Sequence, residues 1–369
     1  MILFIGIVLL LIALIPYIAF LFGIRFGKKP MQTGFPAAFP KISMVISAYN
    51  EERVIEERFA NLMQCHIPKD TWELIFVDDC SNDNTLSCAK TCLEKSEIEF
   101  TIIENRERMG TSRSYNNAIN IAKNPIIITT DADVFFDPDA VNYLIGRMES
   151  DRNIAAVCGE LRPRPNGNNT TQLEYAYRSY YGRMCDWESA VDSTYNFNGA
   201  LVAFRSDLIR RIDDKRGADD ANTAFEAIRK GYRAVYESRA IVYEDIPPHF
   251  REQYRQKIRR AKQLIDATIA NRSLLRMKRP FSRLFYPLRF FMYLFTPVLT
   301  FISLALIVIG LYFTYPLILL VLLVLVFGTA VVWSQNLFNA FLINQFYLLM
   351  GLLNMGTDMR IWESTSKKV

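Results

Sequence analysis

Two carboxylates one residue apart, Asp131 and Asp133, lie in the sequence 125-PIIITTDADVFFDP-138. Residues 125–130 before them are mostly apolar or β-branched, which predicts a buried strand. Two aspartates at a strand end form a hard-oxygen site that suits Mg²⁺ or Mn²⁺ and leaves positions open for phosphate oxygens. A diphosphate on such a metal is a good leaving group, because the metal neutralises the charge that develops on it. A solvated turn has the same spacing, so the rest of the chain must decide between the two interpretations.

Three further strands are predicted ahead of this one, at Ile42–Ser47, Trp72–Val77 and Phe100–Glu104. Another acidic pair, Asp78 and Asp79, follows the second of them. Strands that alternate with helices predict a mostly parallel, doubly wound α/β sheet with its ligand crevice outside the carboxyl ends of the strands. The loop Tyr49–Glu52 and the two acidic pairs are therefore expected to meet in one crevice.

Acidic or small polar residues are expected to begin the helices between these strands. Glu51 and Glu52 open the first helix, because acids in a first turn suit the helix dipole. Ser81 or Asn82 caps the second helix. A turn that contains Gly110 leads into the third.

The pattern loosens between residues 154 and 250. Ile154–Cys158 and Ala200–Phe204 predict short strands, and the tyrosine-rich residues 173–188 between them predict a helix. Arg233–Tyr236 predicts a strand that resumes the edge of the sheet.

Two later predicted helices carry charged residues. In each helix these residues can serve the structure or take part in chemistry. Asp219 or Asp220 is expected to cap a helix that Gly231 ends. Residues 249–267 form a basic helix, which can lie on a membrane surface or supply guanidinium groups to a diphosphate.

Several other classes of site lack support in the sequence. No G-x-G-x-x-G follows the first strand and no G-x-x-x-x-G-K-[ST] occurs, so neither a dinucleotide fold nor a P-loop is indicated. Six cysteines without a C-x-x-C pair and two histidines make a zinc site or a Ser/His/Asp hydrolase a poor fit. Free thiols in a reducing compartment are the simplest interpretation of the cysteines.

Apolar sequence gathers at the two ends of the chain. Residues 1–24 carry no charge and exceed the length of about 20 residues that a membrane span needs, which predicts a retained anchor. Phe290–Thr357 also contains no Asp, Glu, Lys or Arg. Basic clusters at residues 25–29 and 272–289 flank the central body, which places that body in the cytoplasm and favours anionic lipid over nucleic acid as their partner.

The C-terminal apolar region predicts two spans, Phe290–Phe313 and Pro316–Ser334, joined by a tight turn. Gln335–Thr357 is uncharged but rich in Asn and Gln, so a surface-lying or re-entrant helix is favoured over a third span. The tail, residues 358–369, is expected in the cytoplasm.

Taken together, these motifs resemble the family 2 inverting glycosyltransferases, in particular the membrane-embedded branch that includes cellulose and hyaluronan synthases. The resemblance covers roughly residues 40 to 270 and the flanking apolar segments. Five motifs carry it in the same order: VISAYNEE, FVDDCSND, TTDADVFF, FNGALVAFR and GADDANTAFEAIRKGY, followed by QKIRRA.

The resemblance implies a GT-A fold and a role for each matching residue. Asp220 matches the general base, and Asp131 and Asp133 match the metal ligands. Donor-nucleotide contacts fall on Ala48, Tyr49, Asn50, Glu52, Asp78, Asp79 and Asp131. Diphosphate contacts fall on Gln256, Arg259 and Arg260, and acceptor contacts fall on Asn198, Gly199, Ala200 and Asp219.

Two positions depart from the family pattern. Arg260 stands where the family has a Trp beside the acceptor sugar, which places processive chain extension in doubt. Asp219 stands where the family has a Glu, and its shorter side chain can place the acceptor differently.

The resemblance implies a cell-membrane, multi-pass, metal-dependent hexosyltransferase that uses a nucleotide sugar, with UDP-sugar as the first choice. Its acceptor is lipid-linked or a glycan. A processive polysaccharide synthase and a catalytically silent scaffold or nucleotide-sugar sensor stay open as alternatives. The expected organisation is an anchor (1–24), a GT-A domain (40–250), basic interfacial helices (251–289), two spans (290–334), an ambiguous helix (335–357) and a tail (358–369).

Overall fold

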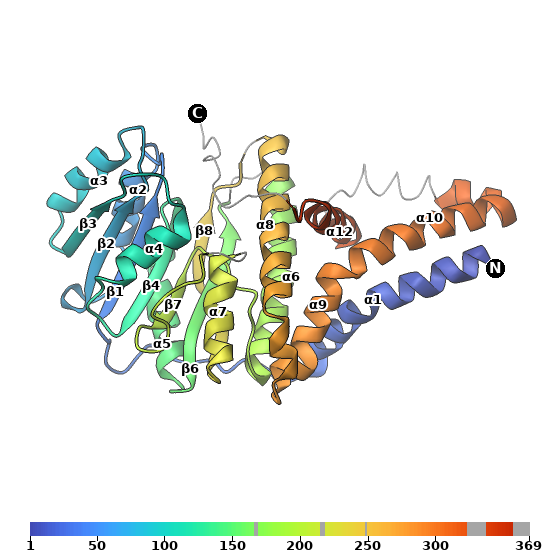
Figure 1. Ribbon diagram of the computed structural model, residues 1–369, viewed down its shortest axis with the longest axis horizontal. Helices are drawn as coiled ribbons and strands as arrows, with labels where there is room; N and C mark the ends of the chain where they lie inside the picture. The colour runs from blue at the N-terminus through green and yellow to red at the C-terminus, as the bar shows by residue number, and fades with distance from the viewer. Residues whose placement is uncertain (166–168, 215–217, 248, 323–336, 357–369) are drawn as a thin grey trace.

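One eight-stranded sheet runs through the globular part of the chain, in the order β3-β2-β1-β4-β7-β6-β8-β5. The computed structural model describes residues 1–165, 169–214, 218–247, 249–322 and 337–356 (Figure 1). The strands are β1 Ile42–Ala48, β2 Trp72–Asp78, β3 Glu99–Glu104, β4 Ile126–Asp131, β5 Val134–Phe136, β6 Ile154–Pro163, β7 Val202–Arg205 and β8 Arg233–Glu244. The first four in sequence pair in parallel, as do β6 and β8, whereas β7 and β5 run antiparallel to their neighbours. The predicted mostly parallel α/β sheet is confirmed.

Helices cover both faces of this sheet, which is why its central strands are apolar almost throughout. They are α2 Ile55–Met63, α3 Thr85–Glu94, α4 Thr111–Ile119, α5 Ala140–Glu149, α6 Asn169–Val191, α7 Asp219–Arg229 and α8 Phe250–Ala270. Along β1 the side chains alternate between two cores. Met44 and Ile46 pack with α2, α3 and α5, whereas Val45 packs with α4, α6 and α7.

The first helix begins later than predicted. Glu51 and Glu52 do not open α2, which starts at Ile55. The backbone N–H of Glu51 donates to Thr85 Oγ1 at 2.7 Å, and the Glu52 carboxylate accepts the N–H of Asn84 at 3.0 Å. These contacts hold the loop after β1 against the loop after β2, so the helix starts one turn further on.

Two predicted helix caps are also wrong. The N-cap of α3 is Asn84 rather than Ser81 or Asn82. The earlier residues are used by the neighbouring loop: Ser81 Oγ accepts the N–H of Asn50 at 3.1 Å, and the N–H of Asn82 donates to Asn50 Oδ1 at 2.8 Å.

In α7 the two aspartates lie inside the first turn, after the N-cap Ala218, rather than at the cap itself. Gly231, at φ +87°, follows the last turn, as predicted for a residue that tolerates the left-handed region.

Strand β8 is longer than the predicted Arg233–Tyr236 and lies between β6 and β5 rather than at the edge. Its pairing with β6 shifts between Glu237 and Ile241, which marks a bulge. The polar residues in that bulge interrupt the apolar pattern, so the sequence signal stops where the bulge begins.

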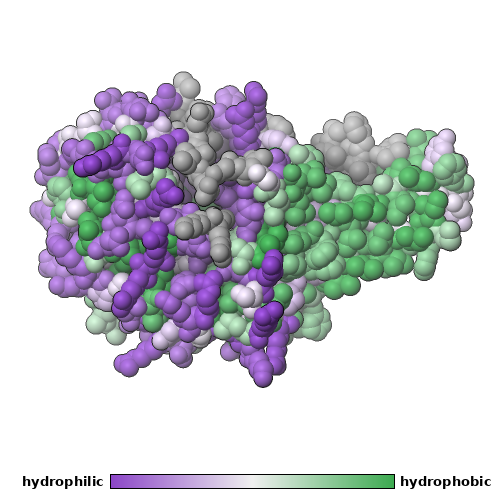
Figure 2. Space-filling model, viewed as in Figure 1, coloured by the Kyte–Doolittle hydropathy of each residue, from purple (hydrophilic) through white to green (hydrophobic). Residues whose placement is uncertain are grey.

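Two apolar helices, α1 Ile2–Phe26 and α10 Thr296–Thr314, project together from the domain as an antiparallel pair (Figure 1). A Cβ on Gly310 would lie 2.7 Å from the Cβ of Leu3, and a Cβ on Gly6 would lie 2.9 Å from Ile307 Cγ1, so these glycines permit the close approach. Both helices are long and apolar enough to cross a membrane. Figure 2 shows this arm as an almost continuous apolar surface beside a mostly hydrophilic domain.

The predicted span Phe290–Phe313 begins too early. Its first residues belong to a separate helix, α9 Tyr286–Leu294, in which Met292 and Tyr293 are fully buried against the domain. The chain turns at Phe295 and α10 then begins. Most of Pro316–Ser334 and all of the tail after residue 356 lie outside the described residues.

The last α-helix that the structure describes, α12 Leu337–Leu353, lies in residues 335–357, for which the sequence favours a surface-lying or re-entrant helix over a third span. It contacts α6, α8, α9 and α10. Gln345 on α12 donates to the hydroxyl of Tyr17 on α1 at 2.7 Å. Its apolar stretch is shorter than that of the two span candidates.

Candidate functional site

A cleft of about 610 Å³ opens at the carboxyl ends of β1 and β4. The parallel register places Ala48 beside Asp78 and Ser47 beside Asp131, so the loops after these strands reach the same edge of the sheet. The first turn of α7 and the middle of α8 complete the walls. The charged residues predicted from sequence that line the cleft are Asp79, Asp131, Asp133, Asp219, Asp220, Arg259 and Arg260.

Asp131 ends β4 and is held from two sides. The hydroxyl of Tyr115 donates to Asp131 Oδ1 at 3.4 Å. Gly199 lies close to the other carboxylate oxygen of Asp131: a Cβ added to Gly199 would be 3.6 Å from Asp131 Oδ2. Burial, followed by the charges of Asp133 and Asp219, raises the pKa of Asp131 to about 7. The carboxylate therefore lies in a region of excess negative charge.

Asp219 and Asp220 enter the cleft from the N-terminus of α7. Asp220 Oδ1 accepts the N–H of Ala221 at 2.7 Å, which uses an otherwise unpaired donor of the first helical turn. Burial and the adjacent Asp219 raise the pKa of Asp220 to about 8, and Asp131 contributes in the same direction. A carboxyl group with a pKa near neutrality can take and release a proton at physiological pH.

Positive charge comes from α8. Arg260 donates to Glu244 Oε1 at 2.7 Å, and Gln256 Nε2 donates to the same oxygen at 3.3 Å. Arg259 lines the cleft beside them, and burial and the charge of Arg260 lower its pKa to about 10, so it stays charged at neutral pH. The cleft thus presents acceptors on β4 and α7 and cationic donors on α8.

The donor set on β4 suits a hard divalent cation. Within the described ranges, no group of three or more His, Cys, Asp or Glu side chains forms a complete ligand set. Asp131 and Asp133 supply two carboxylates in a field of surplus negative charge. That combination fits Mg²⁺ or Mn²⁺, which are held by one or two carboxylates and complete their coordination with water and phosphate oxygens.

Three predicted donor-binding residues do not line the cleft. Asn50, at φ 54°, and Glu52 bind the loop that follows β2. Asp78 is buried, and its Oδ2 accepts the N–H of Ser81 at 3.0 Å. These side chains brace the loops that form the cleft, whereas Ala48 and Tyr49 do line it.

Asp79 lines the cleft and also organises one of its loops. Its carboxylate accepts the backbone N–H groups of Met109 and Gly110 at 2.8 Å each, and the side-chain amide of Asn105 at 2.8 Å. These bonds fix the turn that leads into α4.

The predicted acceptor residues Asn198, Gly199 and Ala200 form a turn at one end of the cleft. Asn198 Nδ2 donates to the carbonyl of Gly159 at 2.9 Å, and the hydroxyl of Thr130 donates to the carbonyl of Ala200 at 2.6 Å. The turn is thereby fixed between β4 and β6.

Sequence reasoning assigned no site role to five charged residues that line the cleft: Glu51, Arg108, Arg113, Asp214 and Glu244. The Arg108 guanidinium lies 3.6 Å from the centre of the Tyr49 ring, in a cation–π contact. Glu244 ends β8 as Asp131 ends β4, so the same signal of an acid after a buried strand was present. It was overlooked because the prediction ended that strand at Tyr236.

Comparison with known proteins gives a consistent family signal. Residues 43–212 match the family model described as Glycosyl transferase family 2. A poly-beta-1,6-N-acetyl-D-glucosamine synthase of Staphylococcus aureus is 23% identical over 222 residues, which are 59% of this chain and 53% of the synthase. A probable glycosyltransferase of Bacillus subtilis, YdaM, is 27% identical over 262 residues, 67% of this chain and 61% of its own length. The chain thus spans between half and two thirds of the length of these curated relatives.

A solved structure shares the fold over nearly the whole chain. It is the mannosyltransferase PcManGT from Pyrobaculum calidifontis, in complex with GDP-Man and Mn²⁺, with a TM-score of 0.82 and 24% identity. The superposition covers 96% of this chain and 99% of that one.

Proposed function

We propose that this chain, of which residues 43–212 match the family model described as Glycosyl transferase family 2, transfers a sugar from a nucleoside diphosphate to an acceptor hydroxyl with inversion of configuration. The observation that supports this reaction is the shared cleft of Asp131, Asp133, Asp220 and Arg259. In the proposed reaction these residues supply a cation site, a base and a cationic partner for a leaving diphosphate within one space.

In the proposed reaction, Asp220 accepts the proton of the acceptor hydroxyl as its oxygen attacks the anomeric carbon. Arg259 and Arg260 stabilise the negative charge that grows on the departing diphosphate. Asp131 and Asp133 are the residues that would hold the metal. A bound Mg²⁺ or Mn²⁺ would neutralise the same developing charge. A single displacement of this kind inverts the anomeric centre.

We propose a uridine-linked donor, with a guanosine-linked donor as the alternative to be tested beside it. The cleft wall near the end of β1 can contact the base and ribose of a nucleotide. It offers the aromatic ring of Tyr49, the guanidinium of Arg108 and the carboxylate of Asp79. They do not by themselves select one base. Mannosyltransferase PcManGT was solved with GDP-Man, which is the reason to include guanosine-linked sugars.

We propose that the protein is attached to the cell membrane through α1 and α10, with its catalytic domain in the cytoplasm. Most of the α1 surface is exposed in the structure, including Phe4 at 70% and Phe22 at 66%, and α10 exposes Phe313 at 78%. Such a surface is unfavourable in water and suits lipid. The basic clusters that flank the domain favour the cytoplasmic side.

A second candidate is processive synthesis of a polysaccharide, because the Staphylococcus aureus relative is a polysaccharide synthase. Transfer of one or a few sugars is the preferred proposal, since Arg260 is held by Glu244 at the position where the family has an aromatic platform. Sizing of the product decides: a ladder of long chains would contradict the preference for short addition.

The direct test is nucleotide release by the detergent-solubilised protein from a panel of UDP- and GDP-sugars, with Mg²⁺, Mn²⁺ or EDTA. Release from one donor is expected, and EDTA or Asp133→Asn should abolish it. Asp137→Asn is the matched control, because Asp137 lies on the same segment but outside the cleft lining. Absence of release from every donor, with and without membrane lipid extract, would contradict the proposed function.

A further inference from the structure

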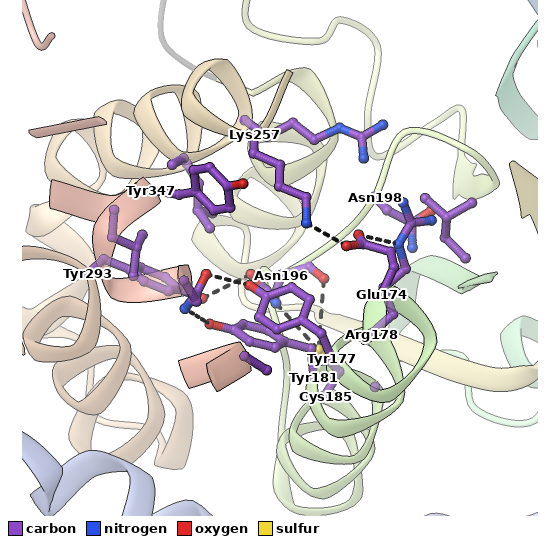
Figure 3. A pocket seen from close by; sticks show the side chains of 18 of the residues that line it. Glu174, Tyr177, Arg178, Tyr181, Cys185, Asn196, Asn198, Lys257, Tyr293 and Tyr347 are labelled. Atoms are coloured by element: carbon purple, nitrogen blue, oxygen red, sulfur yellow. Dashed lines mark hydrogen bonds and ion pairs between the residues drawn. The ribbon is translucent and has the colours of Figure 1, made fainter. Parts of the chain in front are cut away.

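A second cavity of about 250 Å³, here called the side pocket, lies between α6, α8, α9 and α12 (Figure 3). It adjoins the catalytic cleft, because six residues line both spaces: Leu161, Asn196, Phe197, Asn198, Arg260 and Leu264. A molecule bound in the side pocket would therefore contact Asn198 and Arg260, which also line the cleft.

The polar end of the side pocket has a surplus of positive charge. Lys257 donates to Glu174 at 2.6 Å, while Arg178 donates to Glu174 at 2.9 Å and to Glu244 at 3.0 Å. With Arg260 on Glu244, three cations face two carboxylates, which leaves one positive charge. Figure 3 shows Lys257 and Arg178 converging on Glu174 from α8 and α6.

One nitrogen in this cluster has unused hydrogen-bonding capacity. Arg178 Nη1 is buried and has no hydrogen-bond partner among the residues that the structure describes. The Arg178 side chain as a whole is 13% exposed. A buried guanidinium N–H without an acceptor is costly, so this nitrogen is available to donate to an acceptor bound in the side pocket. The surplus charge favours an anionic acceptor, and phosphate is an anion that both the arginine fork and the lysine ammonium bind.

The opposite side of the side pocket is aromatic and apolar. Tyr177 and Tyr181 project from α6, and both hydroxyls bond to Asn344 on α12, at 2.7 Å and 3.3 Å. Ala340, Ile343 and Leu348 of α12 continue this wall. Ile343 is 40% exposed although it lines the cavity, so the side pocket is open to the surface along α12.

That opening lies at the apolar arm. Helix α12 contacts α10, and it is bonded to α1 through Gln345 and Tyr17. An occupant with an anion near Arg178 and an apolar part along α12 would therefore leave the protein beside α1 and α10, the two helices of the apolar arm.

We propose that the side pocket binds the phosphate and the adjoining part of the apolar tail of a lipid-linked acceptor. This inference rests on the proposed glycosyl transfer and names the class of its acceptor. The sugar attached to that phosphate extends past Asn198 and Arg260 into the cleft, where its hydroxyl meets Asp220. In the transfer, the hydroxyl oxygen bonds to the anomeric carbon, the bond from that carbon to the donor diphosphate breaks, and the proton passes to Asp220.

Two simpler occupants fit less well. A neutral glycan leaves the surplus charge and the unpaired Arg178 N–H without a partner. A free phosphate leaves the apolar wall on α12 unfilled. An amphiphile with a phosphate satisfies both ends at once.

The test is equilibrium binding of farnesyl phosphate, farnesol and inorganic phosphate to the full chain in phosphatidylcholine nanodiscs. Farnesyl phosphate is expected to bind with a Kd at least tenfold below those of farnesol and inorganic phosphate. Lys257→Gln should remove most of the preference for farnesyl phosphate over farnesol. Equal binding of farnesol would show an apolar cavity without an anion site, and equal binding of inorganic phosphate would show a free-phosphate site; either result overturns the proposal.

A pair of variants on α12 controls for folding. Ile343→Trp fills the side pocket and is expected to raise the Kd for farnesyl phosphate at least tenfold. Phe346→Trp is the control, because Phe346 is also 40% exposed on α12 but does not line the cavity, and its Kd should stay within twofold of wild type. Equal effects of the two variants would overturn the proposal.

Nucleotide release measured on the same nanodiscs separates this inference from the proposed function. Release into water without an acceptor tests the donor site alone. If release occurs but farnesyl phosphate shows no preferential binding, the acceptor inference fails and the transferase function stands. If farnesyl phosphate binds as expected but no donor is cleaved, the transferase function fails and the side pocket stands as a lipid-phosphate site.

Discussion

The carboxylates on the two sides of Arg260 have opposite pKa shifts. In the cleft, burial and neighbouring carboxylates raise the pKa of Asp131 to about 7 and that of Asp220 to about 8. Burial alone would also raise the pKa of Glu174, which lines the side pocket, and of Glu244, which lines the cleft next to Arg260, but the charges of Arg178, Lys257 and Arg260 lower both to about 2.

The difference comes from the number of cations within reach, because burial acts in the same direction on both sets. Glu174 and Glu244 each bind two basic side chains. The cleft aspartates instead crowd one another. The comparison teaches that the cleft is short of positive charge, as a site for a metal and a proton should be, whereas the ion pairs of the side pocket fix the position of α8 against α6.

The largest expected effect is on catalysis in the cleft. Asp220→Asn should lower the transfer rate by about 10²–10⁴-fold, because the acceptor hydroxyl loses its base. Donor binding should be retained. Product formation and donor affinity are measured side by side, with Asp207→Asn, an exposed carboxylate outside the cleft, as the control. A rate for Asp220→Asn within twofold of wild type would remove Asp220 from the base role.

Glu244→Gln should have its main effect on stability. It removes the charged acceptor that Arg178 and Arg260 share, although Arg178 keeps Glu174 and Arg260 is 42% exposed. The free energy of unfolding is therefore expected to fall by about 2 kcal/mol, as for the loss of a hydrogen bond to a charged group. Chemical denaturation of the detergent-solubilised protein gives the value. The control is Glu149→Gln, whose carboxylate is 40% exposed beside Arg205 and should change stability by less than about 1 kcal/mol. Equal losses in the two variants would contradict a structural role for the Glu244 pairs.

Glu174 should make stability depend on pH in the acidic range. Because its folded-state pKa is depressed, its contribution is fully present above the unfolded pKa of about 4.3 and is lost as the pH falls towards 2. Thermal unfolding between pH 6 and 3 should therefore show a smaller acid-induced loss in Glu174→Gln than in wild type. Parallel curves for the two proteins would show that this ion pair does not contribute.

The smallest expected effect is a gain in stability in Asp220→Asn, the same variant that is expected to transfer sugar more slowly. With EDTA present, Asp220→Asn should exceed wild type in free energy of unfolding by about 1 kcal/mol above pH 8, because one of several repelling carboxylates is removed. The gain in free energy is expected to be smaller than the raised pKa alone would give, because the cleft is open to water, which screens the repulsion between the carboxylates. The folded-state pKa is raised, so the difference should grow from about pH 4 to pH 8 and then level off. A loss of stability would mean that Asp220 is compensated in the folded protein.

The parallel half of the sheet was predictable from sequence, and the reason is burial on both faces. Strands β1, β2 and β4 are mostly apolar or β-branched and are followed by polar loop residues, so both their position and the edge of the sheet that carries the site could be predicted. Asp79, Asp131 and Asp133 could be assigned to one crevice on topology alone, whereas Asp78 of the same acidic pair is buried and binds its own loop.

Other parts depended on contacts between distant segments. The late start of α2 follows from bonds between Glu51, Glu52 and a loop more than 30 residues away. The bulge in β8 hid Glu244, and with it the partner of Arg260. The side pocket is formed by helices that lie far apart in the sequence, so neither its charge surplus nor its apolar wall has a local sequence signal.

The close packing of α1 and α10 also bears on how the protein is made. Thr296 Oγ1 donates to the carbonyl of Ala13 at 3.2 Å, a contact between residues 283 positions apart. At about 5–20 residues per second, the ribosome needs roughly 15–60 s to supply the second helix after the first. During that interval the small-residue face of α1 around Gly6 has no partner, while the domain between the two helices can already fold. Assembly of the arm is therefore a late event in biogenesis, and variants at Gly6 or Gly310 should slow the completion of the protein more than the folding of its domain.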